Sequence, residues 1–211
     1  MKPDVKERPI LFSDPMVRAL LAGLKSQTRR LVSPRVDFAR IKPDRGWRYD
    51  GIWTAEDGGD NGHYFWRRDE RGRLTRDFVS MGRCPFGVTG ERLWVREAWC
   101  RVPWAAKTVT EYRASWGRAD GGLRWKSPIH MPRAESRILL EVTDVRIEWL
   151  QEITESDALA EGTASLMRGY TRYTGEAVDI FRRLWGEIHG RTAWNVNPLV
   201  WVIQFRRLEP A

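Results

Sequence analysis

The stretch Gly23-Leu24-Lys25-Ser26-Gln27-Thr28-Arg29-Arg30 lies at a predicted helix-to-strand junction. Apolar residues recur at helical spacing over residues 14–24, and the glycine that opens the stretch favours a helix stop. Residues 28–32 have strand character. Backbone turns at such junctions aim side chains into clefts, so we expect Lys25 and Thr28 to lie in one.

The rest of the chain alternates long connections with a few regular patterns. A capping box begins one helix, glycines end both later helices, and strand patterns surround them. Helices and strands do not follow one another in βαβ order, so we predict an α+β protein, mainly β, built as a small closed or nearly closed barrel with flanking helices. The expected strands cover residues 92–99, 137–147 and 199–205, and the expected later helices cover residues 154–162 and 175–188.

Two long insertions are predicted in a single domain of residues 1–211, at about residues 35–84 and 101–135. The first is rich in Gly, Asp and Arg, and fits hairpins that turn at residues 57–62 and 69–72. Its apolar content is too thin for a separate core, so we expect it to lie on the barrel. The Trp and Arg residues of both insertions suit base stacking and phosphate contact, and equally suit packing onto the barrel.

Composition narrows the partners of this 211-residue chain. Its formal net charge of +8 and pI near 9.9 favour polyanions, although a solvated basic surface is the alternative. No apolar run approaches the roughly 20 residues of a membrane helix, and the N-terminus lacks a signal-peptide core, so we expect a cytoplasmic protein without membrane contact.

Cysteine and histidine spacing predicts no metal site and no cofactor. Cys84 and Cys100 form no Cys-x-x-Cys pair, and the three histidines show no ligand spacing. Cys84 is interpreted as a buried thiol, with a nucleophile as the alternative.

Three residues are candidates for chemistry: Lys25, Thr28 and Glu161. A hydroxyl needs a base to take its proton, and a lysine with a lowered pKa is such a base. A carboxylate beside the pair would orient the lysine or relay a proton. The alternative is that Lys25 is a surface cation, Thr28 a strand residue and Glu161 a carboxylate at a helix end. The sequence alone does not show that Glu161 approaches Lys25.

The segment Leu21-Ala22-Gly23-Leu24-Lys25-Ser26-Gln27-Thr28-Arg29-Arg30 resembles the ASCH-family signature, in which Gly-x-Lys-x-x-Thr is followed by Arg within two residues. Gly90-Glu91-Arg92-Leu93-Trp94-Val95 resembles the family's Gly-Asp-x-Leu-x-Val entry to a barrel strand. Residues 158–162 resemble its helix bearing a Glu, and residues 200–205 its closing strand. The whole chain, including residues 127–133, is similar to longer ASCH proteins of bacteriophages and prophages.

This resemblance implies a PUA-like β-barrel with a cleft beside the first helix that binds RNA or a modified nucleoside. Small bacterial members of the family hydrolyse the amide of N4-acetylcytidine with a Lys, a Thr and a Glu. At the matching positions, Lys25 would be the general base, Thr28 the nucleophile and Glu161 the proton relay or orienting group. Arg30 would hold a nucleobase carbonyl or a developing oxyanion.

We predict a protein that binds RNA or a modified nucleoside, with hydrolysis of an acylated base such as N4-acetylcytidine as a further activity. The alternatives are a non-catalytic RNA-binding module and a single-strand ribonuclease, because the fold does not determine the substrate. The oligomeric state stays open. The expected contacts to nucleic acid or nucleoside come from Arg29, Arg30, Arg133 and Trp94.

Overall fold

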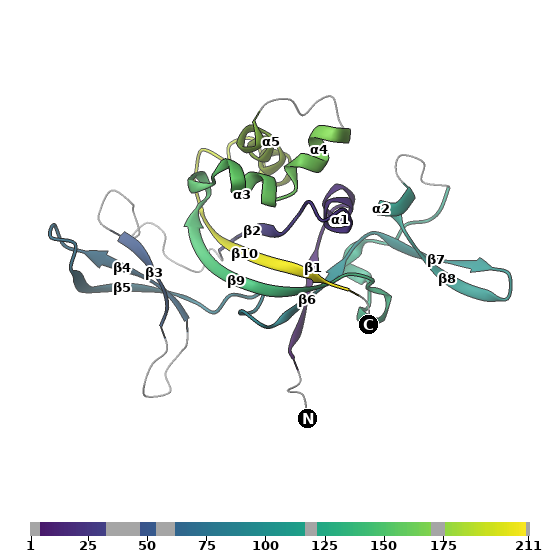
Figure 1. The fold of residues 1–211 in the computed structure, drawn as a ribbon, viewed down its shortest axis with the longest axis horizontal. Coiled ribbons are helices and arrows are strands. Elements are labelled where there is room, and N and C mark those ends of the chain that lie inside the picture. The colour runs from purple at the N-terminus through teal and green to yellow at the C-terminus, as the bar shows by residue number, and fades with distance from the viewer. Residues whose placement is uncertain (1–4, 33–46, 54–61, 117–121, 170–175, 210–211) are drawn as a thin grey trace.

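A five-stranded sheet forms the centre of the protein (Figure 1). The computed structural model describes residues 5–32, 47–53, 62–116, 122–169 and 176–209. The strand order is β1-β6-β9-β10-β2, with β1 parallel to β6 and every other pair antiparallel. The strands are β1 (Glu7–Leu11), β6 (Arg92–Arg96), β9 (Leu139–Trp149), β10 (Leu199–Leu208) and β2 (Gln27–Leu31).

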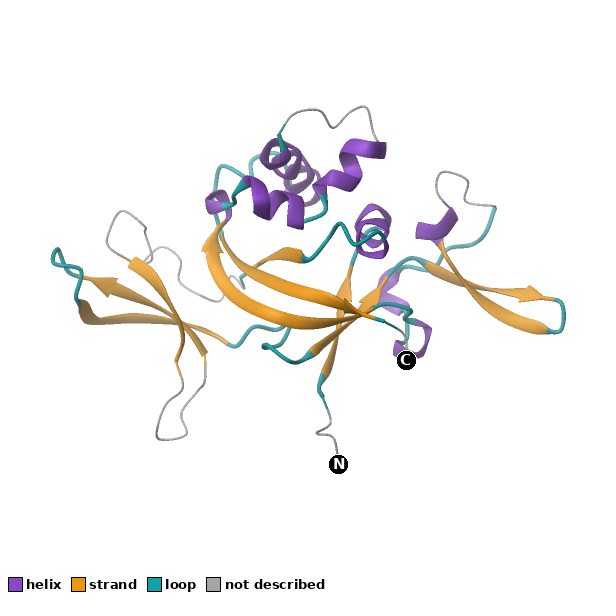
Figure 2. Ribbon diagram, viewed as in Figure 1, coloured by secondary structure: helices purple, strands orange, loops and turns teal. Residues whose placement is uncertain are grey.

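The prediction of a closed barrel is wrong, because β1 and β2 remain the two edges of this sheet. β1, which the sequence analysis did not predict, contains Pro9; proline has no N–H and suits an edge. The sheet is nevertheless curled, since Arg30 on one edge donates from Nη2 to the carbonyl oxygen of Leu11 on the other at 2.6 Å. The α+β class with a predominance of strands is confirmed (Figure 2).

Four helices gather over one side of the sheet: α1 (Asp14–Leu21), α3 (Glu155–Ala160), α4 (Thr163–Gly169) and α5 (Ala177–His189) (Figure 2). The predicted capping box is confirmed, with Thr154 accepting from the backbone N–H of Asp157 at 3.1 Å. Asp14 begins α1 but does not cap it, because the N-cap is Ser13. No helix in the described part of the chain is long and apolar enough to cross a membrane.

β10 is apolar along most of its length because both of its faces are buried. Leu199, Trp201 and Ile203 belong to the larger core cluster, whereas Val200 and Val202 face the smaller cluster under α3 and α5. A strand with two buried faces loses the alternation of polar and apolar residues. This central strand fixes the position of its antiparallel neighbour β2, which carries the Lys-x-x-Thr motif's threonine.

The two predicted insertions contain the outlying elements of the structure, which lie on opposite sides of the central sheet (Figure 1). The turn predicted at residues 69–72 is confirmed, with the Asp69 N–H bonded to the Arg73 carbonyl at 2.9 Å. Residues 57–61 of the other predicted turn lie outside the described residues. The strand predicted over residues 92–99 is interrupted, because Glu97 and Ala98 separate β6 from β7. The remaining elements are β3 (Trp47–Trp53), β4 (Gly62–Arg68), β5 (Leu74–Gly82), β7 (Trp99–Trp104), β8 (Lys107–Tyr112), α2 (Arg113–Trp116) and the 3-10 helices η2 (Pro128–His130), η3 (Arg133–Glu135) and η4 (Leu150–Glu152).

A buried histidine joins the β3-β4-β5 sheet to the central sheet. His63 on β4 is 2% exposed, and its Nδ1 lies 2.5 Å from the Tyr49 hydroxyl oxygen. The ring packs edge-on against Trp201 of β10, with 4.7 Å between centroids. Burial lowers the pKa of His63 to about 4 from 6.5.

This depressed pKa predicts a loss of stability in mild acid. The unfolded chain binds a proton at His63 below about pH 6.5, whereas the folded protein does so only below about pH 4. The free energy of unfolding should therefore fall by up to about 3 kcal/mol between those pH values. Denaturant titrations at several pH values measure it, and His63→Gln should flatten the curve in this window. Parallel curves for the two proteins would contradict the prediction.

Candidate functional site

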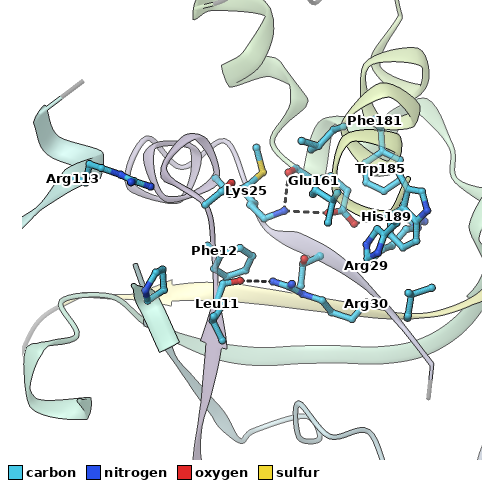
Figure 3. A pocket seen from close by; sticks show the side chains of 17 residues that line it. Leu11, Phe12, Lys25, Arg29, Arg30, Arg113, Glu161, Phe181, Trp185 and His189 are labelled. Atoms are coloured by element: carbon cyan, nitrogen blue, oxygen red, sulfur yellow. Dashed lines mark hydrogen bonds and ion pairs between the residues drawn. The ribbon is translucent and has the colours of Figure 1, made fainter. Parts of the chain in front are cut away.

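A pocket of about 450 Å³ lies between β2, the α1 region and the inner face of α5 (Figure 3). Its volume is in the range of small-molecule sites, roughly 300–1,000 Å³. Phe12, Phe181 and Trp185 supply aromatic walls, while Lys25 and Glu161 supply charged groups. The pocket therefore combines apolar surface with a few polar side chains, as ligand sites do.

Lys25 is buried and held by three acceptors. Its Nζ donates to the carbonyl oxygens of Gln27 and Glu161, both at 2.7 Å, and to Glu161 Oε2 at 3.1 Å. Burial lowers the pKa of Lys25, while the neighbouring carboxylate of Glu161 opposes this effect. The neighbouring backbone is fixed as well, since the N–H of Ser26 bonds to the Ala160 carbonyl at 2.9 Å. The lysine is thus rigidly positioned in a site of low polarity.

Glu161 bridges two cations at the end of α3. Its Oε2 pairs with Lys25, and its Oε1 lies 3.3 Å from Nη1 of Arg29. The residue is 4% exposed and follows the last residue of the helix, where Gly162 turns the chain with a φ of 91°. The structure therefore brings together Lys25 and Glu161, which are 136 positions apart in the chain.

Thr28 lines the same pocket. It is 5% exposed and sits on β2 opposite Ile203 of β10. Its Oγ1 has no hydrogen-bond partner in the parts of the chain that the structure describes. This hydroxyl is available to a ligand, unlike the ammonium of Lys25.

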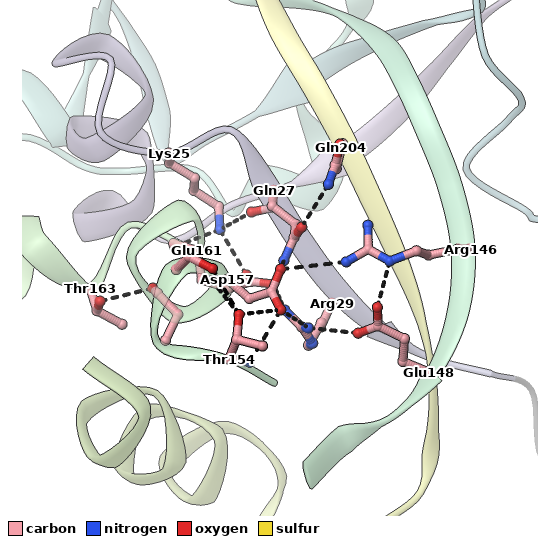
Figure 4. A network of polar contacts seen from close by, with 12 residues as sticks. Lys25, Gln27, Arg29, Arg146, Glu148, Thr154, Asp157, Glu161, Thr163 and Gln204 are labelled. Carbon is pink, nitrogen blue, oxygen red and sulfur yellow. Dashed lines mark hydrogen bonds and ion pairs between the residues drawn. The ribbon is translucent and has the colours of Figure 1, made fainter. Parts of the chain in front are cut away.

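Arg29 belongs to a buried ion-pair network behind the pocket (Figure 4). Its side chain is 0% exposed, and Nη2 lies 2.8 Å from Glu148 Oε2 and 3.3 Å from Asp157 Oδ2. Gln27 also reaches Asp157, donating to Oδ1 at 3.2 Å. Arg29 therefore ties β2 to β9 and α3, and its guanidinium is occupied by carboxylates rather than offered to a phosphate.

Arg30 and His189 lie in the wall of the pocket. The guanidinium of Arg30 lies 5.2 Å from the ring centroid of Phe12, besides its bond to the carbonyl of Leu11. His189 packs on Trp185 with 4.2 Å between ring centroids. Burial, followed by the charge of Arg30, lowers the pKa of His189. Arg30 is thus placed beside the aromatic surface that a planar ligand would contact.

The other two predicted contact residues are not part of this pocket. Trp94 is 7% exposed on β6, and the guanidinium of Arg96 stacks 4.6 Å from its ring centroid. Arg133 in η3 pairs with Glu7 at 2.6 Å. Conversely, sequence reasoning missed the walls formed by Phe181 and Trp185, because an apolar stripe on a helix has the same pattern whether it packs into a core or lines a pocket.

Comparisons with protein-family models, curated proteins and solved structures gave no match. The ASCH assignment and the roles that it implies therefore stay predictions. Within the described residues, no group of three His, Cys, Asp or Glu side chains is arranged to hold a metal ion.

Gly162 allows the lysine stem to pack beside the end of α3. A Cβ built at this glycine would lie 3.0 Å from the Ala19 Cβ and 3.2 Å from the Lys25 Cβ. Both distances are shorter than ordinary contacts, so a side chain here would push the lysine or α1 aside. Gly162 is therefore a positioning residue for Lys25.

A pair of alanine substitutions tests this close packing. Gly162→Ala should lower the free energy of unfolding by at least about 2 kcal/mol, from backbone strain and crowding together. Gly90→Ala is the matched control, because Gly90 has a φ of 89° and no neighbouring atom within 4 Å of the position that a Cβ would take. It should cost only about 1 kcal/mol, from backbone strain. Equal losses in chemical denaturation would contradict the positioning role.

Proposed function

We propose that the pocket binds a nucleobase, either in RNA or as a modified nucleoside, and that Thr28, Lys25 and Glu161 hydrolyse an acyl amide on that base. The observation that carries this proposal is that one aromatic pocket is lined by Thr28, whose hydroxyl has no partner among the described residues, and by a buried lysine–glutamate pair. The three residue types are those that an activated hydroxyl nucleophile needs.

Binding is supported by the shape and lining of the pocket. Phe12, Phe181 and Trp185 give the pocket an aromatic lining, and contacts between a base and aromatic side chains contribute roughly 1–3 kcal/mol per base. Arg30 adds a guanidinium that suits a base carbonyl. The net charge of +8 favours the approach of an anionic polymer.

The proposed reaction starts with transfer of one proton from Lys25 to Glu161, which leaves a neutral amine and a neutral acid. Burial of Lys25 lowers its pKa and so favours the neutral amine. The Thr28 oxygen then attacks the acyl carbon while its proton moves to the amine of Lys25, and the carbonyl electron pair moves onto oxygen. Arg30 stabilises this oxyanion.

Collapse of the tetrahedral intermediate breaks the C–N bond. The departing nitrogen takes the proton from Lys25, so the base leaves with a free amino group and the acyl group remains as an ester on Thr28. Water attacks this ester and gives one proton to Lys25, which passes it to the Thr28 oxygen as the carboxylic acid is released. Return of the first proton from Glu161 to Lys25 restores the ion pair. The net reaction consumes one water molecule.

Non-catalytic binding is the second candidate, and the surroundings of Lys25 favour it. Three acceptors around Nζ match the three N–H groups of an ammonium ion. An amine that stays protonated accepts no proton from Thr28. Under this candidate the ion pair only shapes the polar end of a binding pocket.

Thr28→Val separates the two candidates, because valine keeps the size of threonine and removes the hydroxyl. We expect the release of acetate from N4-acetylcytidine to fall at least about 100-fold, while Thr28→Ser retains activity. Binding of the nucleoside, measured by calorimetry, should change only a few-fold. Thr143→Val, an exposed substitution on β9, is the control and should leave both measurements unchanged.

Each outcome has a distinct meaning. Full hydrolysis by Thr28→Val would remove the threonine from the mechanism. Binding without turnover by the unmodified protein would support the non-catalytic candidate. Absence of binding to acylated nucleosides and RNA alike would contradict the whole proposal.

A further inference from the structure

A second hollow, of about 790 Å³, lies along the outer side of α5. Arg182, Arg183 and Arg191 line it together with the indole of Trp194, and Gly186 contributes only backbone. The inner side of the same helix contributes Phe181, Trp185 and His189 to the pocket described above. One helix therefore separates an apolar pocket from a basic groove, here called the α5 groove.

The α5 groove carries an excess of positive charge. Its three guanidinium groups outnumber the two carboxylates, which belong to Asp179 and Glu187. Across the described ranges, neither Arg182 nor Arg191 pairs with a carboxylate. An arginine that is not paired with a carboxylate suits a phosphate, whose oxygen atoms accept two N–H groups at once.

Trp194 gives the groove a fixed aromatic surface. The guanidinium of Arg182 lies 5.8 Å from its ring centroid, and Phe181 packs edge-on against the indole at 6.4 Å. The backbone is also held, since the Trp194 carbonyl accepts from Gln151 Nε2 at 2.9 Å and from the Asn197 N–H at 3.1 Å. A half-buried indole beside these arginines suits a ligand with both a planar ring and a negative charge.

The groove and the pocket adjoin at the C-terminal end of α5. His189 lines the pocket and Gly190 lines the groove, and consecutive Cα atoms are only about 3.8 Å apart. A ligand that occupies both hollows has its shortest connection along the chain at this end of the helix, where adjacent residues line the two. Consecutive nucleotides of a single strand fit this arrangement, because each carries a planar base and a phosphodiester joins it to the next.

We propose that the α5 groove binds a phosphodiester and the attached base of single-stranded RNA whose adjacent nucleotide occupies the pocket. This inference rests on the proposed function and specifies its substrate as a polynucleotide rather than a free nucleoside. Arg182 and Arg191 bind phosphate oxygens, and Trp194 stacks on the base.

The test compares one RNA and one nucleoside on the same variants. The RNA is a single strand of about ten nucleotides with one internal N4-acetylcytidine, and the nucleoside is free N4-acetylcytidine. Arg191→Glu and Arg182→Glu should each weaken RNA binding about tenfold or more, and should make its salt dependence shallower. Affinity for the free nucleoside should stay within about twofold, because neither residue lines the pocket.

Lys107→Glu is the charge-matched control. Lys107 is exposed on the β7–β8 hairpin, which projects to one side of the central sheet, away from α5 (Figure 1). Equal weakening of RNA binding by Lys107→Glu and Arg191→Glu would mean that only the net charge of the protein matters. That result would overturn the inference. Equal weakening of RNA and free nucleoside by Arg191→Glu would overturn it too.

Failure of the proposed function gives a different pattern. A protein that neither binds nor hydrolyses N4-acetylcytidine, whether free or within the RNA, contradicts the pocket proposal. The ratio of RNA affinities between Arg191→Glu and Lys107→Glu still decides the role of the groove. Thermal unfolding of each variant should match that of the unmodified protein, since these side chains are exposed.

Discussion

The ion pairs of Glu161 are the interaction on which both the fold and the candidate site depend. A buried charge is costly unless it is paired and hydrogen-bonded. Glu161 meets this requirement for Lys25 and Arg29 together, one carboxylate oxygen for each cation. Arg29 obtains two further carboxylates, from Glu148 on β9 and Asp157 on α3. The end of α3 is therefore fixed against β2, and the pocket takes its polar end from the same contacts.

The same network bears on the proposed chemistry. If Lys25 gives its proton to Glu161, that carboxyl group no longer neutralises Arg29. Glu148 and Asp157 still do so, at 2.8 and 3.3 Å, and the guanidinium is not left unpaired. If Glu161 were the only carboxylate near Arg29, its protonation would leave a buried guanidinium unpaired. Lys25 would then keep its proton more firmly. Arg29 therefore stays paired with carboxylates whether the proton lies on Lys25 or on Glu161.

Local sequence signals predicted much of the secondary structure, because they act over a few residues. Thr154 is the N-cap of α3, and Gly23 lies just after the end of α1 with a φ of 69°, which favours glycine. Neighbouring arginines show where such signals stop. Arg29 and Arg30 look equivalent in the sequence, yet one pairs with three carboxylates and the other reaches the carbonyl of Leu11. Strand geometry sends adjacent side chains to opposite faces, and only the tertiary fold determines what each face meets.

The error over the barrel and the position of the pocket have one physical cause. A closed barrel would join β1 to β2 by backbone hydrogen bonds, and these strands are instead linked by the side chain of Arg30. Leu11 and Phe12 from the end of β1 line the pocket together with residues of β2. The pocket therefore occupies the seam that the sheet leaves open. α5 covers this seam with Phe181 and Trp185, so an apolar stripe that would complete a core in a closed barrel becomes the wall of a binding site.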